Sequence, residues 1–257
     1  MAPARALDDR VALVTGGGKG IGAAIALRLA TDGARVAVLG RDRASLEGIA
    51  REIDGMVLVA DVADPVAVDR ELLRMRERMG DVSILVCNAG VADSAPLMGT
   101  TDEMWERAMA VNATSAFRLA RTIVPGMVKT GWGRVINVAS NAGLTGYAYT
   151  SAYCASKHAM VGLTRALAIE LARTGVTVNA VCPGFVDTDM AATAISRIAS
   201  KTRRTPEQAR SALEELNPQK RLVTAGEVAH VVGMLSSDEA RGINGQAITI
   251  DGGQVMR

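Results

Sequence analysis

Short runs of apolar, often β-branched residues recur along the chain, separated by longer segments whose apolar residues have helical spacing. The runs do not alternate between apolar and polar residues, which is the pattern of strands buried on both faces. Strands that alternate with helices pair in parallel through right-handed crossovers. The sequence therefore predicts an α/β fold, a doubly wound parallel sheet of about seven strands. The expected strands are Val11–Thr15, Val36–Leu39, Met56–Val59, Val82–Cys87, Arg134–Val138, Val176–Val181 and Ala247–Ile250.

Size and composition exclude several classes of protein. With 257 residues, 49% of them hydrophobic, the chain can build one substantial core, and we expect a single domain over 1–257. A net charge of +2 gives no broad basic field, so no nucleic-acid partner is expected. Neither a signal peptide nor a membrane span is expected. Cys87, Cys154 and Cys182 lack metal-ligand spacing and are typical of a reducing compartment, so we expect a cytoplasmic protein without a metal site.

A glycine-rich turn follows the first expected strand and leads into a helix rich in alanine and leucine. Glycines let the backbone turn tightly and approach a pyrophosphate, while the start of the helix offers unpaired N–H groups to the anion. The position of the turn after the first strand of an α/β chain favours a dinucleotide site. Its candidate residues are Gly16, Gly18, Lys19, Gly20, Ile21 and Gly22.

The end of the second strand bears on the choice between NAD and NADP. A protein that binds NAD usually places a carboxylate there for the ribose 2′-hydroxyl. Here Gly40 and Arg41 follow the strand, and Lys19 could lie on the same side, so two cations favour the 2′-phosphate of NADP(H). Asp42 lies close enough to oppose this interpretation, and NAD(H) stays possible. Residues after the third strand are expected beside the adenine; these are Asp61 and Val62.

One tyrosine is the candidate acid/base group. Of the three tyrosines, only Tyr153 has a lysine four residues later, Lys157, which lies on the same face if this segment is a helix. A free phenol ionises near pH 10, and lowering its pKa by about three units needs about 4 kcal/mol of preferential stabilisation of the phenolate. A cation one helical turn away is a source of that free energy. Ser140 closes the strand that precedes this helix.

Together these motifs resemble the short-chain dehydrogenase/reductase family, over essentially the whole chain. The matching elements are the turn Thr15–Gly22, Asn88-Ala89-Gly90 after the fourth strand, Asn112, Ser140, Tyr153-x-x-x-Lys157, and Pro183-Gly184 with Thr188. The interval from Ser140 to Tyr153 also suits the family. The resemblance implies a Rossmann fold and hydride transfer between nicotinamide and a ketone or secondary alcohol.

The resemblance also implies roles for individual residues. Tyr153 would donate or accept the proton, and Ser140 would hydrogen-bond the substrate oxygen. Lys157 would bind the nicotinamide ribose and lower the pKa of Tyr153, helped by the positive charge of oxidised nicotinamide. Asn112 would hold a water that links Lys157 to solvent. Further cofactor contacts would come from Asn88, Ala89, Gly90, Pro183, Gly184, Val186 and Thr188.

The sequence constrains the identity of the substrate less than it constrains the reaction. The stretch at about 185–215 has a helical pattern and is expected to form a lid over an apolar pocket. The run Glu170–Val186 resembles 3-oxoacyl-carrier-protein reductases and ketoreductases of aromatic polyketide synthesis, whereas Val91–Pro96 lacks the characteristic turn of either. Four cations of the lid could receive the phosphates of a coenzyme A or carrier-protein thioester, or could form a solvated helix face balanced by nearby glutamates. They are Arg197, Lys201, Arg203 and Arg204.

We therefore expect an NADP(H)-dependent reductase, most plausibly of 3-oxoacyl thioesters. An NAD(H)-dependent dehydrogenase of a cyclic or small secondary alcohol is the alternative within the family. A cofactor-binding regulator without catalysis is the alternative from another class, although it would be expected to have lost Ser140, Tyr153 or Lys157. The resemblance further implies a homotetramer, with a dimer as the alternative.

Overall fold

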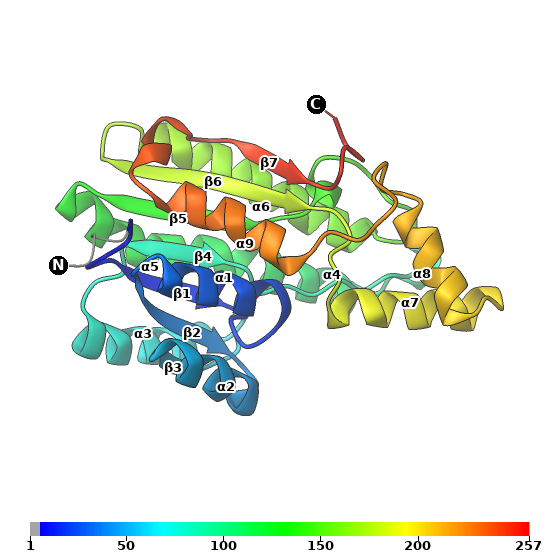
Figure 1. Ribbon diagram of the computed structural model, residues 1–257, viewed down its shortest axis with the longest axis horizontal. Helices are drawn as coiled ribbons and strands as arrows, with labels where there is room; N and C mark the ends of the chain where they lie inside the picture. Colours follow the sequence, from blue (N-terminus) through cyan, green and yellow to red (C-terminus); the bar gives the residue numbers. More distant parts are fainter. Residues whose placement is uncertain (1–5, 257) are drawn as a thin grey trace.

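The computed structural model describes residues 6–256, in which seven strands form one parallel sheet (Figure 1). The strand order is β3-β2-β1-β4-β5-β6-β7, so the chain first builds one half of the sheet outward from β1 and then crosses over to build the other. The strands are β1 (Val11–Thr15), β2 (Arg35–Gly40), β3 (Met56–Val59), β4 (Ile84–Cys87), β5 (Gly133–Val138), β6 (Val176–Pro183) and β7 (Ala247–Ile250). The predicted fold class is confirmed.

Two layers of helices cover the sheet. One face packs against α1, α2 and α9, and the other against α3, α5 and α6. The helices of the first layer are α1 (Gly20–Thr31), α2 (Arg43–Ile53) and α9 (Ala225–Ser236). Those of the second layer are α3 (Pro65–Met79), α5 (Ser115–Thr130) and α6 (Ser151–Glu170). Short segments complete the chain: η1 (Leu97–Gly99), α4 (Asp102–Ala108), η2 (Met109–Thr114), η3 (Asn141–Gly143) and η4 (Glu239–Gly242).

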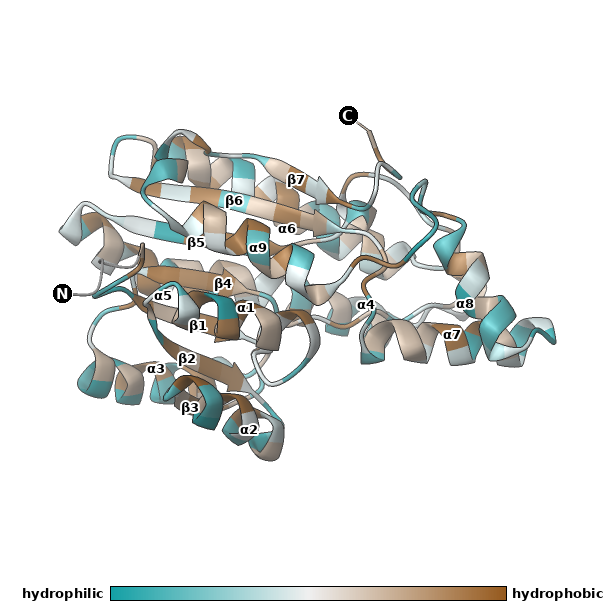
Figure 2. Cartoon of the chain, in the orientation of Figure 1, coloured by the Kyte–Doolittle hydropathy of each residue, from teal (hydrophilic) through white to brown (hydrophobic). Residues whose placement is uncertain are grey.

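The central strands are buried on both faces, as their uninterrupted apolar composition predicts. All residues of β1, β4, β5 and β6 are buried, and Figure 2 shows the strands as largely hydrophobic ribbons between more mixed helices. Alternate residues of each strand then contribute to the two separate apolar clusters on either side of the sheet. This burial fixes the register of the strands and therefore the positions of the loops at their carboxyl ends.

The stretch at about 185–215, where the sequence shows a helical pattern, forms two helices. They are α7 (Asp189–Thr202) and α8 (Pro206–Glu214), and Figure 1 shows both projecting beyond the carboxyl ends of the strands. Thr205 and Gln208 form a reciprocal capping box at the start of α8, where Pro206 is tolerated because the first helical N–H has no partner. A small apolar cluster of their own holds the pair together: Ala191, Ile195, Ala209, Leu213 and Leu222.

The strand boundaries differ slightly from the sequence prediction. β4 begins at Ile84, two residues later than expected, and β6 continues to Pro183 because its last residues pair with β7. None of the helices in the described part of the chain combines the length and the apolar character that crossing a membrane requires.

Candidate active site

The glycine-rich turn is held in place by the strand beside it. Thr15 Oγ1 accepts hydrogen bonds from the backbone N–H groups of Asn88 (2.9 Å) and Ala89 (3.0 Å). The Asn88 side chain donates in return to the carbonyl oxygens of Thr15 (2.9 Å) and Gly16 (3.3 Å). These bonds join the carboxyl ends of β1 and β4, so that the turn and the Asn88-Ala89-Gly90 segment form one rigid wall.

The turn also explains why these positions require glycine. Gly16 has a φ of +64°, a conformation that side chains disfavour. A Cβ on Gly22 would overlap the carbonyl oxygen of Gly16 and lie 2.5 Å from the Asn88 amide nitrogen. Lys19 precedes α1 with no side-chain cap, which leaves the first N–H groups of the helix available to an anion. The turn therefore fits the pyrophosphate of a dinucleotide.

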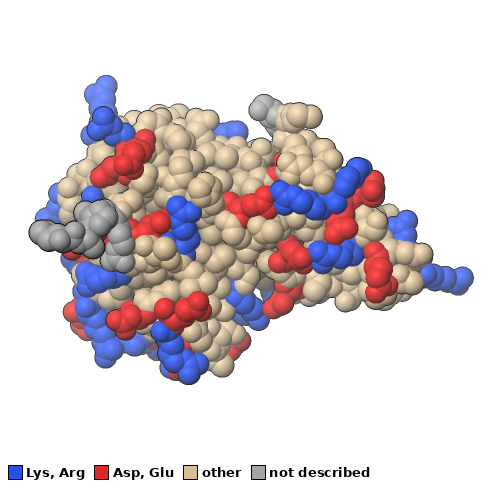
Figure 3. All heavy atoms as spheres, viewed as in Figure 1, with Lys and Arg blue, Asp and Glu red and all other residues tan. Residues whose placement is uncertain are grey.

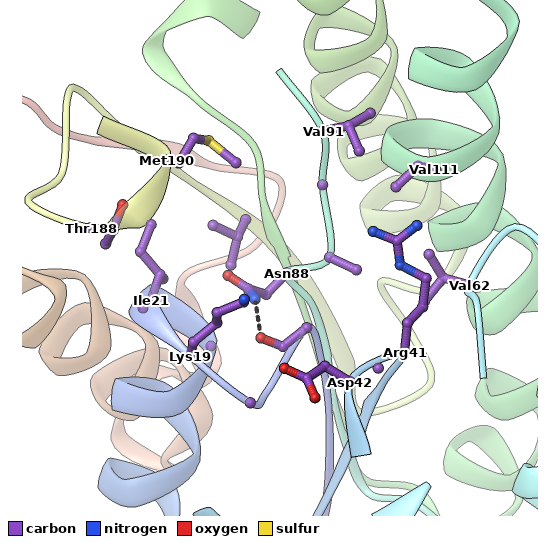
Figure 4. Close-up of a pocket in the computed structure, with 18 of the residues that line it drawn as sticks. Lys19, Ile21, Arg41, Asp42, Val62, Asn88, Val91, Val111, Thr188 and Met190 are labelled. Carbon is purple, nitrogen blue, oxygen red and sulfur yellow. Dashed lines mark hydrogen bonds between the residues drawn. The ribbon is translucent and has the colours of Figure 1, made fainter. Parts of the chain in front are cut away.

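A cleft of about 510 Å³ runs along this edge of the sheet and brings most of the predicted cofactor residues together (Figure 4). The predicted residues that line it are Gly16, Gly18, Lys19, Gly20, Ile21, Gly22, Arg41, Asp61, Val62, Asn88, Ala89, Gly90, Tyr153, Lys157 and Thr188. Three others do not line it. Pro183 is buried at the end of β6, Gly184 packs against Asp251, and Val186 is buried beside Val223.

At the expected adenosine end, β2 ends in Gly40, and Arg41 forms an ion pair of 3.6 Å with Asp61. The neighbouring carboxylate, Asp42, caps α2 by accepting hydrogen bonds from the hydroxyl and backbone N–H of Ser45. These bonds lower the pKa of Asp42, with Lys19 contributing a smaller electrostatic effect. Asp42 therefore serves as the N-cap of α2. Its position next to Arg41 in the sequence did not predict this role.

The Tyr153 and Lys157 side chains come from the first two turns of α6, as predicted. The Lys157 ammonium lies 5.9 Å from the centre of the Tyr153 ring. It is buried and donates to the carbonyl oxygen of Val138 at 2.8 Å, with the Met160 sulfur at 3.6 Å. The end of β5 therefore fixes the ammonium beside the phenol.

Burial dominates the pKa of Tyr153 in this structure. Burial raises the pKa of the phenol above its usual value of 10, and a hydrogen bond with Ser140 lowers it only in part. The same burial lowers the pKa of Lys157 to about 8. The raised pKa keeps the phenol protonated at neutral pH, because burial disfavours the charged phenolate. The lowering of this pKa by Lys157 together with the positive charge of oxidised nicotinamide stays a prediction for the protein with cofactor bound.

Asn112 lies in η2, a π-helical turn between α4 and α5, and is completely buried. Its Oδ1 accepts from the backbone N–H of Val91 (2.8 Å), and its Nδ2 donates to the Val91 carbonyl (3.0 Å) and to Ser156 Oγ (2.8 Å). Both amide hydrogens are therefore used to fix the chain after Gly90 against α6. A water held here would have to hydrogen-bond to backbone groups of η2. Such π-helical turns frequently occur at functional sites.

Ser140 lies two residues after the end of β5 and caps η3, where its hydroxyl accepts from the Ala142 N–H at 3.1 Å. The hydroxyl of Tyr153 is within hydrogen-bonding reach of it, although Ser140 itself does not line the cleft. Sequence reasoning missed several other residues that do line it: Gly40, Asp42, Ser45, Leu46, Ala60, Val91, Val111, Val138, Ala139, Asp189 and Met190. Many of these directly follow or precede predicted positions, which is the only signal the sequence offers for them.

A family model described as short chain dehydrogenase matches residues 10–199. The chain belongs to the short-chain dehydrogenase family. Its members catalyse hydride transfer at a carbinol or carbonyl carbon, so this chain is an oxidoreductase of that class.

Individual members of the short-chain dehydrogenase family match over nearly the whole chain. The 3-oxoacyl-[acyl-carrier-protein] reductase MabA of Mycobacterium tuberculosis is 39% identical over 248 residues, which are 96% of this chain and 94% of the relative. The D-beta-hydroxybutyrate dehydrogenase of Cupriavidus necator is 39% identical over 258 residues, covering 98% of this chain and all of the relative. A crystal structure of an actinorhodin polyketide ketoreductase variant with NADPH superposes with a TM-score of 0.92 at 36% identity, covering 95% of this chain and 97% of that one.

Proposed function

We propose that this short-chain dehydrogenase is an NADP(H)-dependent reductase of 3-oxoacyl thioesters. The observation that carries the proposal is the position of Tyr153 and Lys157 in the same cleft as the glycine turn, with Ser140 beside the phenol. An acid, a cation and a hydroxyl donor at one end of a dinucleotide cleft are the groups that carbonyl reduction requires.

The proposed cofactor assignment depends on the two ends of the cleft. The glycine turn and the start of α1 would hold the pyrophosphate. Arg41 and Lys19 would receive the 2′-phosphate, since Gly40 supplies no carboxylate at the end of β2. The NADPH in the crystal structure of the similar ketoreductase supports this assignment. At the other end, Lys157 would bind the nicotinamide ribose, with Asn88, Gly90 and Thr188 lining the space around the ring.

The bound nicotinamide supplies or accepts a hydride, and the chain's own residues control the proton. Tyr153 would donate its proton to the substrate oxygen, and Ser140 would donate a hydrogen bond to the same oxygen. The raised pKa of Tyr153 keeps the phenol protonated at neutral pH, which suits a proton donor. Such a general acid contributes about 10²–10⁴ in rate, and a donor aimed at the developing oxyanion about 3–4 kcal/mol.

After donating its proton, Tyr153 would be reprotonated through Lys157 and a water held near η2. The Lys157 ammonium, with a pKa of about 8, can donate a proton at neutral pH. Asn112 would keep this path open by holding Val91 and Ser156 in place, so its role is to position rather than to transfer.

Substrate class is inferred from the relatives and from the lid. The similarity to MabA, by its name a 3-oxoacyl-[acyl-carrier-protein] reductase, supports a thioester substrate delivered by coenzyme A or a carrier protein. We infer that the stretch at 185–215 acts as the lid, since Met190 on α7 lines the cleft opposite Val91 (Figure 4).

A second candidate is an NAD(H)-dependent dehydrogenase of a small secondary alcohol. The similarity to a D-beta-hydroxybutyrate dehydrogenase supports this alternative, as do Asp42 and Asp61 beside Arg41. The intact set of Ser140, Tyr153, Lys157 and Asn112 argues against a regulator without catalysis.

We also propose a homotetramer in the cytoplasm. Several apolar side chains on the outer surfaces of α5 and α6 are exposed, including Ile169, with 81% of its surface accessible, and Phe117, with 44%. Exposed apolar residues on neighbouring helices support an interface with another copy of the chain. Light scattering after size exclusion tests the mass of the assembly.

One spectrophotometric screen tests the proposed activity. NADPH and NADH are each mixed with 3-oxoacyl thioesters, free 3-oxo acids and cyclic ketones, and NADP⁺ and NAD⁺ with the matching alcohols. We expect the fastest oxidation with NADPH and a 3-oxoacyl thioester. Faster turnover of a small alcohol with NAD⁺ would favour the second candidate, and no turnover with any pair would contradict the proposal.

A further inference from the structure

Arg197 on α7 differs from Arg210, the arginine of α8. Arg210 forms ion pairs with Asp187 (2.7 Å) and Glu214 (2.9 Å). Arg197 is half-buried, and within residues 6–256 no carboxylate lies within ion-pair distance of it. Its recorded hydrogen bond runs from Nη1 to Ser94 Oγ, at 2.6 Å. A guanidinium has five N–H donors, so most of its capacity remains for a ligand.

The helical position of Arg197 places it on the cleft side of α7. Met190, which lines the cleft, precedes it by seven residues, or two turns, so the two side chains lie on the same face about 10 Å apart along the axis. Ala194 lies between them on that face and carries only a methyl group as its side chain. Ala191 and Ile195 instead face α8 in the apolar cluster of the projecting pair. The guanidinium therefore lies farther out along the face that Met190 presents to the cleft.

The opposite wall is fixed at the same level. Ser94 belongs to the segment after Asn88-Ala89-Gly90, three residues beyond the cleft-lining Val91. Its neighbours are also tied down: the Ala95 N–H donates to the Tyr149 carbonyl at 2.9 Å, and Asp93 lies 4.0 Å from Arg107. Arg197 thus bridges the two walls at the outer end of the substrate side.

We propose that Arg197 binds an oxyanion of the substrate, about two helical turns beyond the cleft-lining Met190. The group is the phosphate of a phosphopantetheine arm, which a guanidinium can bind through two parallel hydrogen bonds. The inference rests on the proposed carbonyl reduction and specifies which carbonyl compounds are preferred. The Ser94 hydroxyl holds the guanidinium ready when no ligand is bound.

Burial distinguishes Arg197 from the neighbouring cations, since Arg197 is half-buried and Arg204 is exposed. Figure 3 shows acidic and basic side chains interspersed over α7 and α8. Arg204 lies in the exposed link between the two helices, beyond the end of α7. Arg204 therefore provides a matched control, since its replacement removes the same charge from the same projecting pair.

The test compares Arg197→Met, Arg197→Lys, Ser94→Ala and Arg204→Met with the wild-type chain. Each protein is assayed with NADPH and three substrates that share one reacting end: acetoacetyl-coenzyme A, its neutral N-acetylcysteamine thioester, and acetoacetate. We expect Arg197→Met to lower kcat/KM by about 10- to 100-fold for the coenzyme A thioester. The loss should be less than twofold for the neutral thioester and for acetoacetate, whose carboxylate lies one methylene from the reacting carbonyl. Arg197→Lys should retain part of the preference for the coenzyme A thioester over the neutral thioester. Arg204→Met should retain all of this preference.

The other outcomes separate a binding role from a structural one. If Arg197 only latches the two walls, Arg197→Met and Ser94→Ala will change turnover of the neutral thioester and the coenzyme A thioester equally, which overturns the proposal. The preference of the wild-type chain for the coenzyme A thioester should also shrink as ionic strength rises. Calorimetric titration with coenzyme A is independent of turnover, and equal affinities of wild type and Arg197→Met for coenzyme A overturn the proposal. Turnover of no carbonyl compound at all would instead contradict the reductase assignment.

Discussion

The two halves of the cleft are built in different ways. The cofactor half consists of the carboxyl ends of β1, β2 and β4, where backbone groups of buried strands are joined by the Thr15 and Asn88 hydrogen bonds. The proposed substrate half consists of α7 and α8, which pack through a small apolar cluster and are tied to the body by contacts such as Arg197–Ser94. The first half holds atoms rigidly, as hydride transfer requires, while the second can change residues without disturbing the sheet.

The largest expected effect breaks the rigid half. In Gly22→Ala the new methyl group would overlap the Gly16 carbonyl oxygen and crowd the Asn88 amide, so the turn must move. We expect affinity for NADPH to fall by more than about 100-fold, as a shift of the pyrophosphate cradle removes several hydrogen bonds at once. Fluorescence titration of NADPH measures this affinity, and circular dichroism checks the fold. Unchanged affinity would contradict the proposed pyrophosphate site.

The next effect concerns the choice of cofactor within the same half. Arg41→Ala should weaken NADPH binding by about 10- to 100-fold and NADH binding by less than threefold, because only NADPH brings a 2′-phosphate. Asp61 then loses its ion-pair partner, but the pair is exposed and contributes little to stability. The dissociation constants of both nucleotides are compared by titration, and an equal effect on the two would reject the 2′-phosphate contact.

A smaller effect concerns the stability of the rigid half. It tests whether the buried Lys157 lowers the free energy of unfolding. Burial lowers the pKa of Lys157 to about 8, so the native state disfavours its charge. At about 1.4 kcal/mol per pKa unit, Lys157→Met should raise the free energy of unfolding by about 1–3 kcal/mol at pH 7, with the lost Val138 hydrogen bond offsetting part of the gain.

The pH dependence has a definite sign. Burial of the Lys157 charge lowers the free energy of unfolding by its full amount below pH 8, because Lys157 is protonated there in both the native and the unfolded chain. This destabilisation falls as pH rises towards the unfolded value of 10.5, because the native chain releases the proton first. The Tm difference between Lys157→Met and wild type should therefore narrow from pH 7 to pH 10, and a difference that widens would contradict this explanation.

The smallest effect concerns the substrate half. Ile195 is buried between α7 and α8, so Ile195→Ala should loosen the pair. We expect KM for the carbonyl substrate to rise by about three- to tenfold, with NADPH affinity unchanged, since the projecting pair is stabilised separately from the sheet. A parallel loss of NADPH affinity would mean that the two halves are coupled rather than independent.

The same contrast explains what the sequence alone can predict. The glycine turn and the Tyr153–Lys157 pair are predictable because a tight turn or a helical spacing allows few residue types at those positions. The division of the lid at Thr205 follows from a cap that a helical pattern does not reveal. The Arg197–Ser94 bond joins residues 103 apart, and no local pattern relates them. The raised pKa of Tyr153 depends on burial, which the distance to one lysine along a helix does not determine.

The most direct test of the account is the turnover of Tyr153→Phe with NADPH bound. The ring is retained and only the phenolic hydroxyl is lost, so the fold and the affinity for NADPH should remain within about twofold of wild type. We expect kcat to fall by about 10²–10⁴-fold with any carbonyl compound that the wild-type chain reduces. Near-normal turnover would show that another group donates the proton and would contradict the proposed active site.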